Sequence, residues 1–141
     1  MIGTGSVNHG DDELAMDESK IVDGIVIVND RDPRESVVFN FHSWVAIIQA
    51  IMVKYAGKSE EEAKSLVLDS PLVEHALDRY MAIVVRAHEL DYHFAMLLAH
   101  GEQYWHRGID SDPPGDFWKW EEQYRLDHNL EADDFIFSDE E

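Results

Sequence analysis

The chain contains no cysteine. A protein without thiols has no disulfide framework, no cysteine nucleophile and no thiolate ligand for a metal ion, and it is compatible with a reducing compartment. Long hydrophobic runs are also lacking, because the longest is far shorter than the roughly 18 apolar residues that span a bilayer. Residues 1–20 lack the basic and apolar regions of a secretory signal. We therefore expect a soluble, cytoplasmic protein.

The short motifs that mark common catalytic sites are missing as well. There is no Gly-x-Ser-x-Gly nucleophile elbow, and the glycines near the start are not followed by the strand–helix unit of a phosphate-binding loop. His88 and His93 are five residues apart. That spacing turns one imidazole about 140° from the other around a helix, so the two do not form a helical zinc pair. We predict no enzyme activity, no cofactor and no metal, with a small metal-dependent enzyme as the second alternative.

Basic residues are scarce. Eleven lysines and arginines face 30 acidic residues, which gives a net charge of −19. The charge is uneven, since residues 110–141 hold twelve acids and two bases, whereas residues 25–109 hold twelve acids and eight bases. No basic stripe is available to bind phosphates, and an acidic surface repels nucleic acids and anionic membranes. We predict a basic protein partner, no direct nucleic-acid binding and no membrane binding.

The length and the 45% hydrophobic content suit one domain with a real core. Residues 21–28 and 36–41 are rich in β-branched and aromatic side chains, and residues 29–34 between them have turn chemistry that includes Pro33. This pattern predicts a β-hairpin. From Ser43 the apolar positions repeat every three or four residues, which predicts an amphipathic helix that ends at Gly57.

Further helix signals follow along the chain. Ser59 and Glu62 have the spacing of a capping box, and Ser70-Pro71 marks the start of a third helix. The apolar positions of that helix wrap more than one face, so we expect it to be the most buried helix. Its apolar pattern continues to Gly101, and a break at residues 89–91 is possible. A last short helix is expected to begin after Asp116 as its cap.

These signals together predict the fold class and the domain organisation. The fold is α+β and mostly helical, with an N-terminal β-hairpin followed by four or five packed helices. Residues 1–19 are expected to be a flexible segment, residues 20–130 a single globular domain, and residues 131–141 an acidic C-terminal segment.

An aromatic cluster precedes the closing segment. Six aromatic residues fall within 21 positions: Tyr104, Trp105, Phe117, Trp118, Trp120 and Tyr124. Trp118 and Trp120 are two residues apart, so on a helix they point in different directions and one should lie exposed among acids. Exposed aromatics beside carboxylates are typical of an interface for a basic partner, in which the rings anchor and the charges steer.

The closing sequence EADDFIFSDEE sets Phe135, Ile136 and Phe137 between acidic residues. Two interpretations stay open, namely a short strand added to the hairpin or a loose peptide that a basic partner orders. The hairpin edges could also join a sheet of the partner. The residues predicted to bind the partner are Asp110, Asp112, Asp116, Trp118, Trp120, Glu121, Glu122, Asp133, Asp134, Phe135 and Phe137.

Two long blocks carry a resemblance to a known class of protein. They are SWVAIIQAIMVKYAGKSEEEAKSLVLDSPLV and YHFAMLLAHGEQYWHRG, followed by a Pro-rich acidic loop and FWKWEEQYRL. Over about residues 43–126 the chain resembles small immunity proteins of bacterial toxin–immunity pairs, including contact-dependent inhibition systems. The resemblance implies a cytoplasmic protein that binds one cognate toxin domain, often a nuclease, and occludes its active site. No catalytic residues carry over.

The physical argument from charge points to the same role. A nuclease presents cationic groups to phosphates, and an acidic inhibitor is steered to that face. The first alternative is a nucleic-acid mimic, such as a phage anti-restriction or anti-CRISPR inhibitor, which would spread its carboxylates over an extended surface. The clustering of charge near one terminus favours a compact patch. The identity of the toxin and the oligomeric state stay open.

Overall fold

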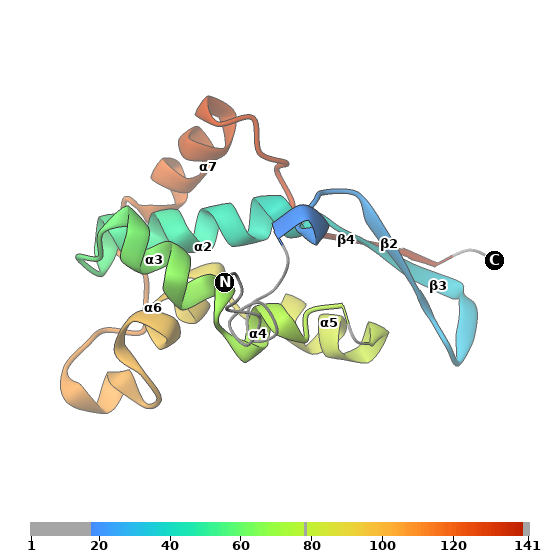
Figure 1. The fold of residues 1–141 in the computed structure, drawn as a ribbon, viewed down its shortest axis with the longest axis horizontal. Helices are drawn as coiled ribbons and strands as arrows, with labels where there is room; N and C mark the ends of the chain where they lie inside the picture. The colour runs from blue at the N-terminus through green and yellow to red at the C-terminus, as the bar shows by residue number, and fades with distance from the viewer. Residues whose placement is uncertain (1–17, 78, 140–141) are drawn as a thin grey trace, which may run out of the picture.

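The structure is a computed structural model that describes residues 18–77 and 79–139. A three-stranded antiparallel sheet lies at one end, and helices surround a central helix (Figure 1). The predicted class, α+β and mostly helical with an N-terminal hairpin, is confirmed. The elements are η1 (Glu18–Lys20), β2 (Ile25–Asn29), β3 (Asp32–Phe39), α2 (Phe41–Tyr55), α3 (Glu60–Leu68), α4 (Pro71–Glu74), α5 (Tyr80–Ala87), α6 (Asp91–His100), η2 (Tyr104–Arg107), α7 (Phe117–Asp127) and β4 (Phe135–Asp139).

The closing segment forms the third strand of the sheet. The strand order is β2-β3-β4, and β4 runs antiparallel to β3 with Phe135 opposite Phe39 and Phe137 opposite Val37. The rings of Phe39 and Phe135 are stacked with centroids 4.9 Å apart. Of the two interpretations left open by the sequence, the structure therefore supports the packed strand.

The predicted hairpin is present, but its boundaries differ. Pro33 was expected in the turn and instead lies within β3. It makes no ladder pair, because the register shifts so that Val28 pairs with Ser36 while Asn29 pairs with Asp32. A proline, which has no N–H to donate, is tolerated at such an irregularity.

The start of α2 gathers segments from both ends of the described chain. The side-chain oxygen of Asn40 accepts the N–H of Gly24 at 3.0 Å, and its side-chain nitrogen donates to the carbonyl of Asp133 at 2.7 Å. Ser43 donates through Oγ to Asp23 and accepts the N–H of Glu131 at 2.9 Å. These bonds explain why the helix begins at Phe41, two residues earlier than predicted, with the strand ending at Phe39.

The core is built on α2, which corrects the expectation that the third helix is the most buried. Figure 1 shows α2 running through the middle of the molecule, and α3, α6 and α7 pack against it. Its fully buried side chains include Trp44, Ile47 and Ile51. By contrast α5 buries Ile83 while Met81 and Val85 are exposed, because this helix lies at the periphery with one side against β2.

The long third helix predicted from residue 70 to Gly101 is divided into α4, α5 and α6. The anticipated break at residues 89–91 is present, since α5 ends at Ala87 and Leu90 has an extended backbone before α6. An earlier break separates α4 from α5, and Arg79 is extended there. No glycine or proline marks either break, so tertiary packing sets them.

Two of the three predicted helix-end features are present, and the third is not. The capping box of Ser59 and Glu62 is present with both hydrogen bonds formed, and Gly57 adopts a left-handed φ of 71° after α2. Asp116 occupies the position before α7 but its side chain caps nothing there. Instead it accepts a hydrogen bond of 3.4 Å from the hydroxyl of Tyr55.

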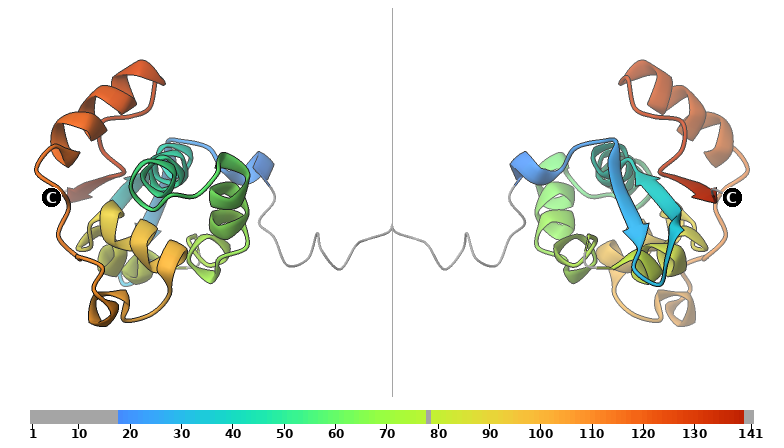
Figure 2. Two further views of the ribbon diagram at one scale, coloured as in Figure 1. Left: turned by 90° about the vertical axis from the view of Figure 1, so that its left-hand side faces the viewer. Right: turned by 90° about the vertical axis from the view of Figure 1, so that its right-hand side faces the viewer.

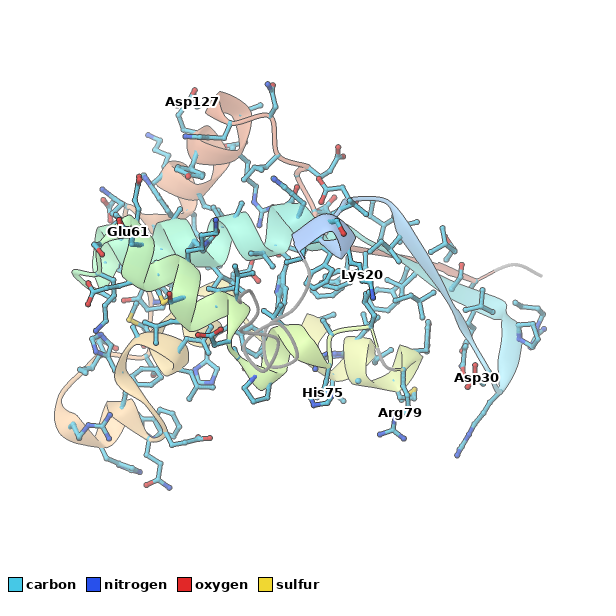
Figure 3. All side chains as sticks on the ribbon, viewed as in Figure 1. Lys20, Asp30, Glu61, His75, Arg79 and Asp127 are labelled. Carbon is cyan, nitrogen blue, oxygen red and sulfur yellow. The ribbon has the colours of Figure 1, made fainter. Side chains whose placement is uncertain are left out.

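Two views from the sides show α7 projecting from the rest of the molecule and β4 lying at its margin (Figure 2). Figure 3 shows that Glu61 on α3, Asp127 at the end of α7 and Asp30 at the tip of the hairpin all project outward. Among the residues that the structure describes, no helix has both the length and the apolar content needed to cross a membrane.

Candidate protein-binding groove

An open groove of about 410 Å³ lies between the corner joining α5 to α6, the helix α7 and the strand β4. We call it the β4 groove. Six of the eleven residues predicted to bind a partner line it: Trp118, Glu121, Asp133, Asp134, Phe135 and Phe137. The other lining residues are Ala87, Glu89, Leu90, Asp91, Phe117, Arg125 and Ala132.

Regular spacing places the side chains that form the walls of the groove. On α7, Phe117, Glu121 and Arg125 follow one another at four-residue intervals, so they lie on one face of the helix. On β4, Phe135 and Phe137 alternate with Ile136 and therefore lie on the same face of the sheet. One face of α7 and one face of β4 thus border the same space.

Three apolar side chains of the groove are accessible to a partner. Trp118 is 54% exposed, and Leu90 and Phe137 are each 44% exposed. Ring contacts fix the positions of the two aromatic side chains, since Trp118 meets Phe117 edge to face at 5.1 Å and Phe137 meets Tyr80 edge to face at 6.2 Å. Exposed side chains with fixed positions bind a partner at a small cost in conformational entropy.

The floor of the groove holds a buried ionic cluster centred on Arg125, which we call the Arg125 cluster. The guanidinium of Arg125 lies 3.0 Å from Asp134, 3.1 Å from Asp91 and 3.2 Å from Glu121. It also donates to the carbonyl of Glu131 at 2.8 Å. The side chains of Arg125, Asp91 and Asp134 are 8%, 10% and 9% exposed, so α7, α6 and the start of β4 are joined at one desolvated point.

The cluster holds three carboxyl groups for one cation, and the pKa of Asp91 is shifted there. Burial raises the pKa of Asp91 well above its usual range, and a hydrogen bond with the carboxyl of Asp134 raises it further against the opposing charge of Arg125. Burial alone would lower the pKa of Arg125, but the charges of Asp134, Asp91 and Glu121 outweigh this and raise it. The arginine therefore stays charged, while Asp91 binds a proton more readily than an exposed aspartate does.

The two remaining acids that line the groove form no ion pair with the residues that the structure describes. Asp133 is exposed at the entrance to β4, and Glu89 is exposed at the corner between α5 and α6. No lysine lines the groove. A cationic partner therefore meets carboxylates around accessible aromatic rings.

The five other predicted residues lie outside this groove. Trp120 and the exposed Glu122 lie on other faces of α7, and Trp120 lines a second groove with α2 and α3 in which Lys54 lies 5.8 Å above its ring. Asp110 and Asp112 are exposed in the loop before α7, where Asp110 accepts the N–H of Asp112 at 2.9 Å. Asp116 is exposed and contacts Tyr55 instead of the groove.

Sequence reasoning missed Glu89, Leu90, Asp91 and Arg125 as groove residues, and it considered residues 89–91 as the place of a possible helix break. One signal was available for Arg125. It is one of two bases in residues 110–141, and the helical repeat places it on the same face as Phe117. Glu89 and Leu90 gave no comparable signal, because they reach the groove through tertiary packing alone.

His88 and His93 are not arranged to bind a metal ion in the described part of the chain. There, no group of three or more histidine, aspartate or glutamate residues is placed to hold a metal ion. His88 follows the end of α5 and bonds the carbonyl of Val84 at 2.8 Å, whereas His93 on α6 bonds the hydroxyl of Tyr104 at 2.8 Å.

Comparisons with protein-family models, with curated proteins and with solved structures found no significant match.

Proposed function

We propose that this protein is an immunity protein that binds a cognate basic toxin domain and neutralises it by covering the active site of the toxin. The observation that supports this proposal is the β4 groove, in which Trp118, Leu90 and Phe137 are accessible among carboxylates and no lysine is present. Apolar anchors of this kind supply affinity, and the surrounding charge supplies steering and register.

The net charge of −19 favours a nuclease as the toxin. An enzyme that cleaves nucleic acid presents cationic side chains to phosphates, so its active face complements an acidic surface. Electrostatic attraction raises the association rate, which suits an inhibitor that must capture a toxin before the toxin acts. A cytoplasmic location would place the inhibitor where such a toxin meets its substrate.

A nucleic-acid mimic of the anti-restriction or anti-CRISPR type is the alternative. The outward-projecting acids on α3, α7 and the hairpin tip would serve such a mimic, because they are distributed over several faces of the molecule (Figure 3). Mimicry depends on those distributed charges and does not require the rings of the β4 groove. The two functions therefore differ in which residues matter.

The test is co-expression with the toxin domain encoded next to the gene of this protein, with growth and the dissociation constant as readouts. We expect the wild-type protein to restore growth. Trp118→Ala should weaken binding roughly 30-fold or more, as loss of an interface anchor does. The matched control is Leu126→Ala on the same helix, where the side chain is 69% exposed but does not line the groove.

A charge comparison separates the groove from the rest of the acidic surface. We expect Glu89→Lys with Asp133→Lys to weaken binding far more than Glu122→Lys with Asp127→Lys, although both pairs change the net charge equally. Equal effects of the two pairs, with no effect of Trp118→Ala, would favour a mimic. A neighbouring gene that encodes no toxin, or a toxin that the wild-type protein neither binds nor neutralises, would contradict the proposal of an immunity protein.

A further inference from the structure

We propose that the outer edge of β4 accepts an extended basic segment of the partner as a fourth strand of the sheet. This inference rests on the proposed function and specifies how the partner is held. It depends on three features of the structure, namely the direction of the backbone groups of β4, the position of the strand, and the charges around it.

The backbone of β4 has groups that point away from β3. In antiparallel pairing, residues that exchange hydrogen bonds across the ladder alternate with residues whose backbone groups point outward. The N–H of Asn40 donates to the carbonyl of Asp134 at 2.8 Å, which fixes the alternation in this register. Ile136 and Ser138 therefore bond toward β3, and the N–H and C=O groups of Phe135 and Phe137 point to the outer edge.

That edge is open in the described part of the chain. Its sheet ends at β4, with no further strand paired on the outer side. Both panels of Figure 2 place β4 at the margin of the molecule. An unpaired edge of this kind is a template for strand addition. The five residues of β4 can receive a segment about 16 Å long.

The charges around the edge select a basic segment. Asp133 precedes the strand, Asp139 ends it, and Glu121 and Glu89 lie across the adjoining groove. The same acids argue against a second copy of this chain, because pairing two β4 edges would bring the acidic ends of both strands into one small patch. Like charges placed opposite each other destabilise strand pairs.

The two faces of the sheet also specify a side-chain pattern. Beside β4, a fourth strand would place alternate side chains over the β4 groove, near Phe137 and the carboxylates. The intervening side chains would lie on the opposite face, next to Ile136, which is 45% exposed. The segment that fits best therefore alternates basic residues with apolar residues.

The experiment uses the full-length protein and a capped eight-residue peptide of alternating lysine and valine as the probe. A peptide of alternating lysine and proline serves as the control, since it has the same charge but half of its backbone donors are missing. We expect the first peptide to bind at least 10-fold more tightly in isothermal titration. Equal affinities, or no binding of the lysine–valine peptide at millimolar concentration, would overturn the proposal.

Two variants at one position test the backbone contact directly. Phe137→Pro removes an outward N–H and leaves the bonds of Ile136 and Ser138 to β3 in place. Phe137→Ala removes the ring and keeps that N–H. We expect the proline variant to bind the lysine–valine peptide at least 10-fold more weakly than the alanine variant, with both variants showing the circular dichroism spectrum of the folded protein. Equal binding by the two folded variants would overturn strand addition.

Hydrogen exchange of the wild-type protein tests strand addition even if the proline variant does not fold. We expect the bound peptide to slow exchange of the amides of Phe135 and Phe137 and to leave that of Lys119 unchanged. Binding without this protection would refute strand addition and leave the basic partner in place. Failure of the wild-type protein to bind the toxin domain is a separate result, and it refutes the proposed function.

Discussion

Replacing Arg125 with methionine is the most direct test of the Arg125 cluster. Methionine keeps much of the length and volume of the side chain but removes the cation and its four donor contacts, to Asp91, Glu121, Asp134 and the carbonyl of Glu131. The side chains of Asp91 and Asp134 would then be 10% and 9% exposed in the native packing with no cation beside them.

The expected loss follows from that burial. Removing one partner of a buried ion pair costs about 3–5 kcal/mol, because a desolvated charge is left uncompensated. A domain of this size has a total stability of about 5–15 kcal/mol, so Arg125→Met should lower the midpoint of thermal unfolding by about 10–20 °C. Urea denaturation at pH 7.5 measures the change in unfolding free energy.

The loss of unfolding free energy in Arg125→Met should also depend on pH, which the loss from a simple packing defect would not. The folded-state pKa of Asp91 is raised, so between its unfolded and its folded pKa the folded protein binds a proton that the unfolded chain has released. Its contribution is fully favourable below the unfolded pKa of about 4 and is lost as the pH rises through the folded pKa. Removing the arginine raises that folded pKa further, so the deficit of Arg125→Met should shrink as the pH falls from 7.5 to 4.5.

A matched control comes from the hairpin. Arg34 also contacts a carboxylate, that of Asp32 at 2.9 Å, but its side chain is 65% exposed. Water screens this pair, so Arg34→Met should leave the unfolding free energy nearly unchanged. A loss below about 1 kcal/mol for Arg125→Met, or an equal loss at pH 4.5 and 7.5, would refute the account of the Arg125 cluster.

Two further predictions concern the same region. Asp91→Asn keeps a side chain that can bond both Arg125 and Asp134 but cannot ionise. It should therefore be more stable than the wild-type protein at pH 8, and the gain should vanish near pH 3, as urea denaturation would show. A stabilisation that is the same at both pH values would contradict the raised pKa of Asp91. Truncation after Leu130 removes Phe135 and Asp134. The truncated protein should therefore have a lower thermal midpoint even without a partner, in addition to any loss of affinity. A truncated protein with the wild-type melting curve would show that β4 contributes nothing to the fold.

The elements that the sequence predicted well are those with local causes. The spacing of apolar residues predicts α2, and the pairing of Ser59 with Glu62 predicts the start of α3. The hairpin follows from two β-branched runs with a turn between them. Each of these signals lies within a few residues of the structure it produces.

The elements that could not be predicted have causes distant in sequence. The pairing of β4 with β3 joins residues almost a hundred positions apart, and nothing local to Phe135 decides between a strand and a loose peptide. The break between α4 and α5 has no glycine or proline to mark it. The helical repeat showed that Trp118 and Trp120 diverge, but only the packing of α7 on α2 assigns Trp118 to the surface at 54% exposure.

The candidate site shows the same division. Charge and aromatic content directed attention to residues 110–141, and the groove gathers six of the eleven residues named from them. The other wall comes from the corner at Glu89 and Leu90, which the sequence places far from α7. The loop acids Asp110 and Asp112 share the composition of the site but not its location.

The hydrogen bonds at the start of α2 also set the order in which the molecule can be completed. Asn40 and Ser43 hold residues near Gly24 on one side and Glu131 and Asp133 on the other, so the start of α2 needs groups that lie 88 and 93 positions further along the sequence. During synthesis the hairpin and α2 leave the ribosome long before these groups exist. The complete sheet, the Arg125 cluster and the β4 edge therefore form only after residues 131–139 have been made, and contacts of such long range slow folding.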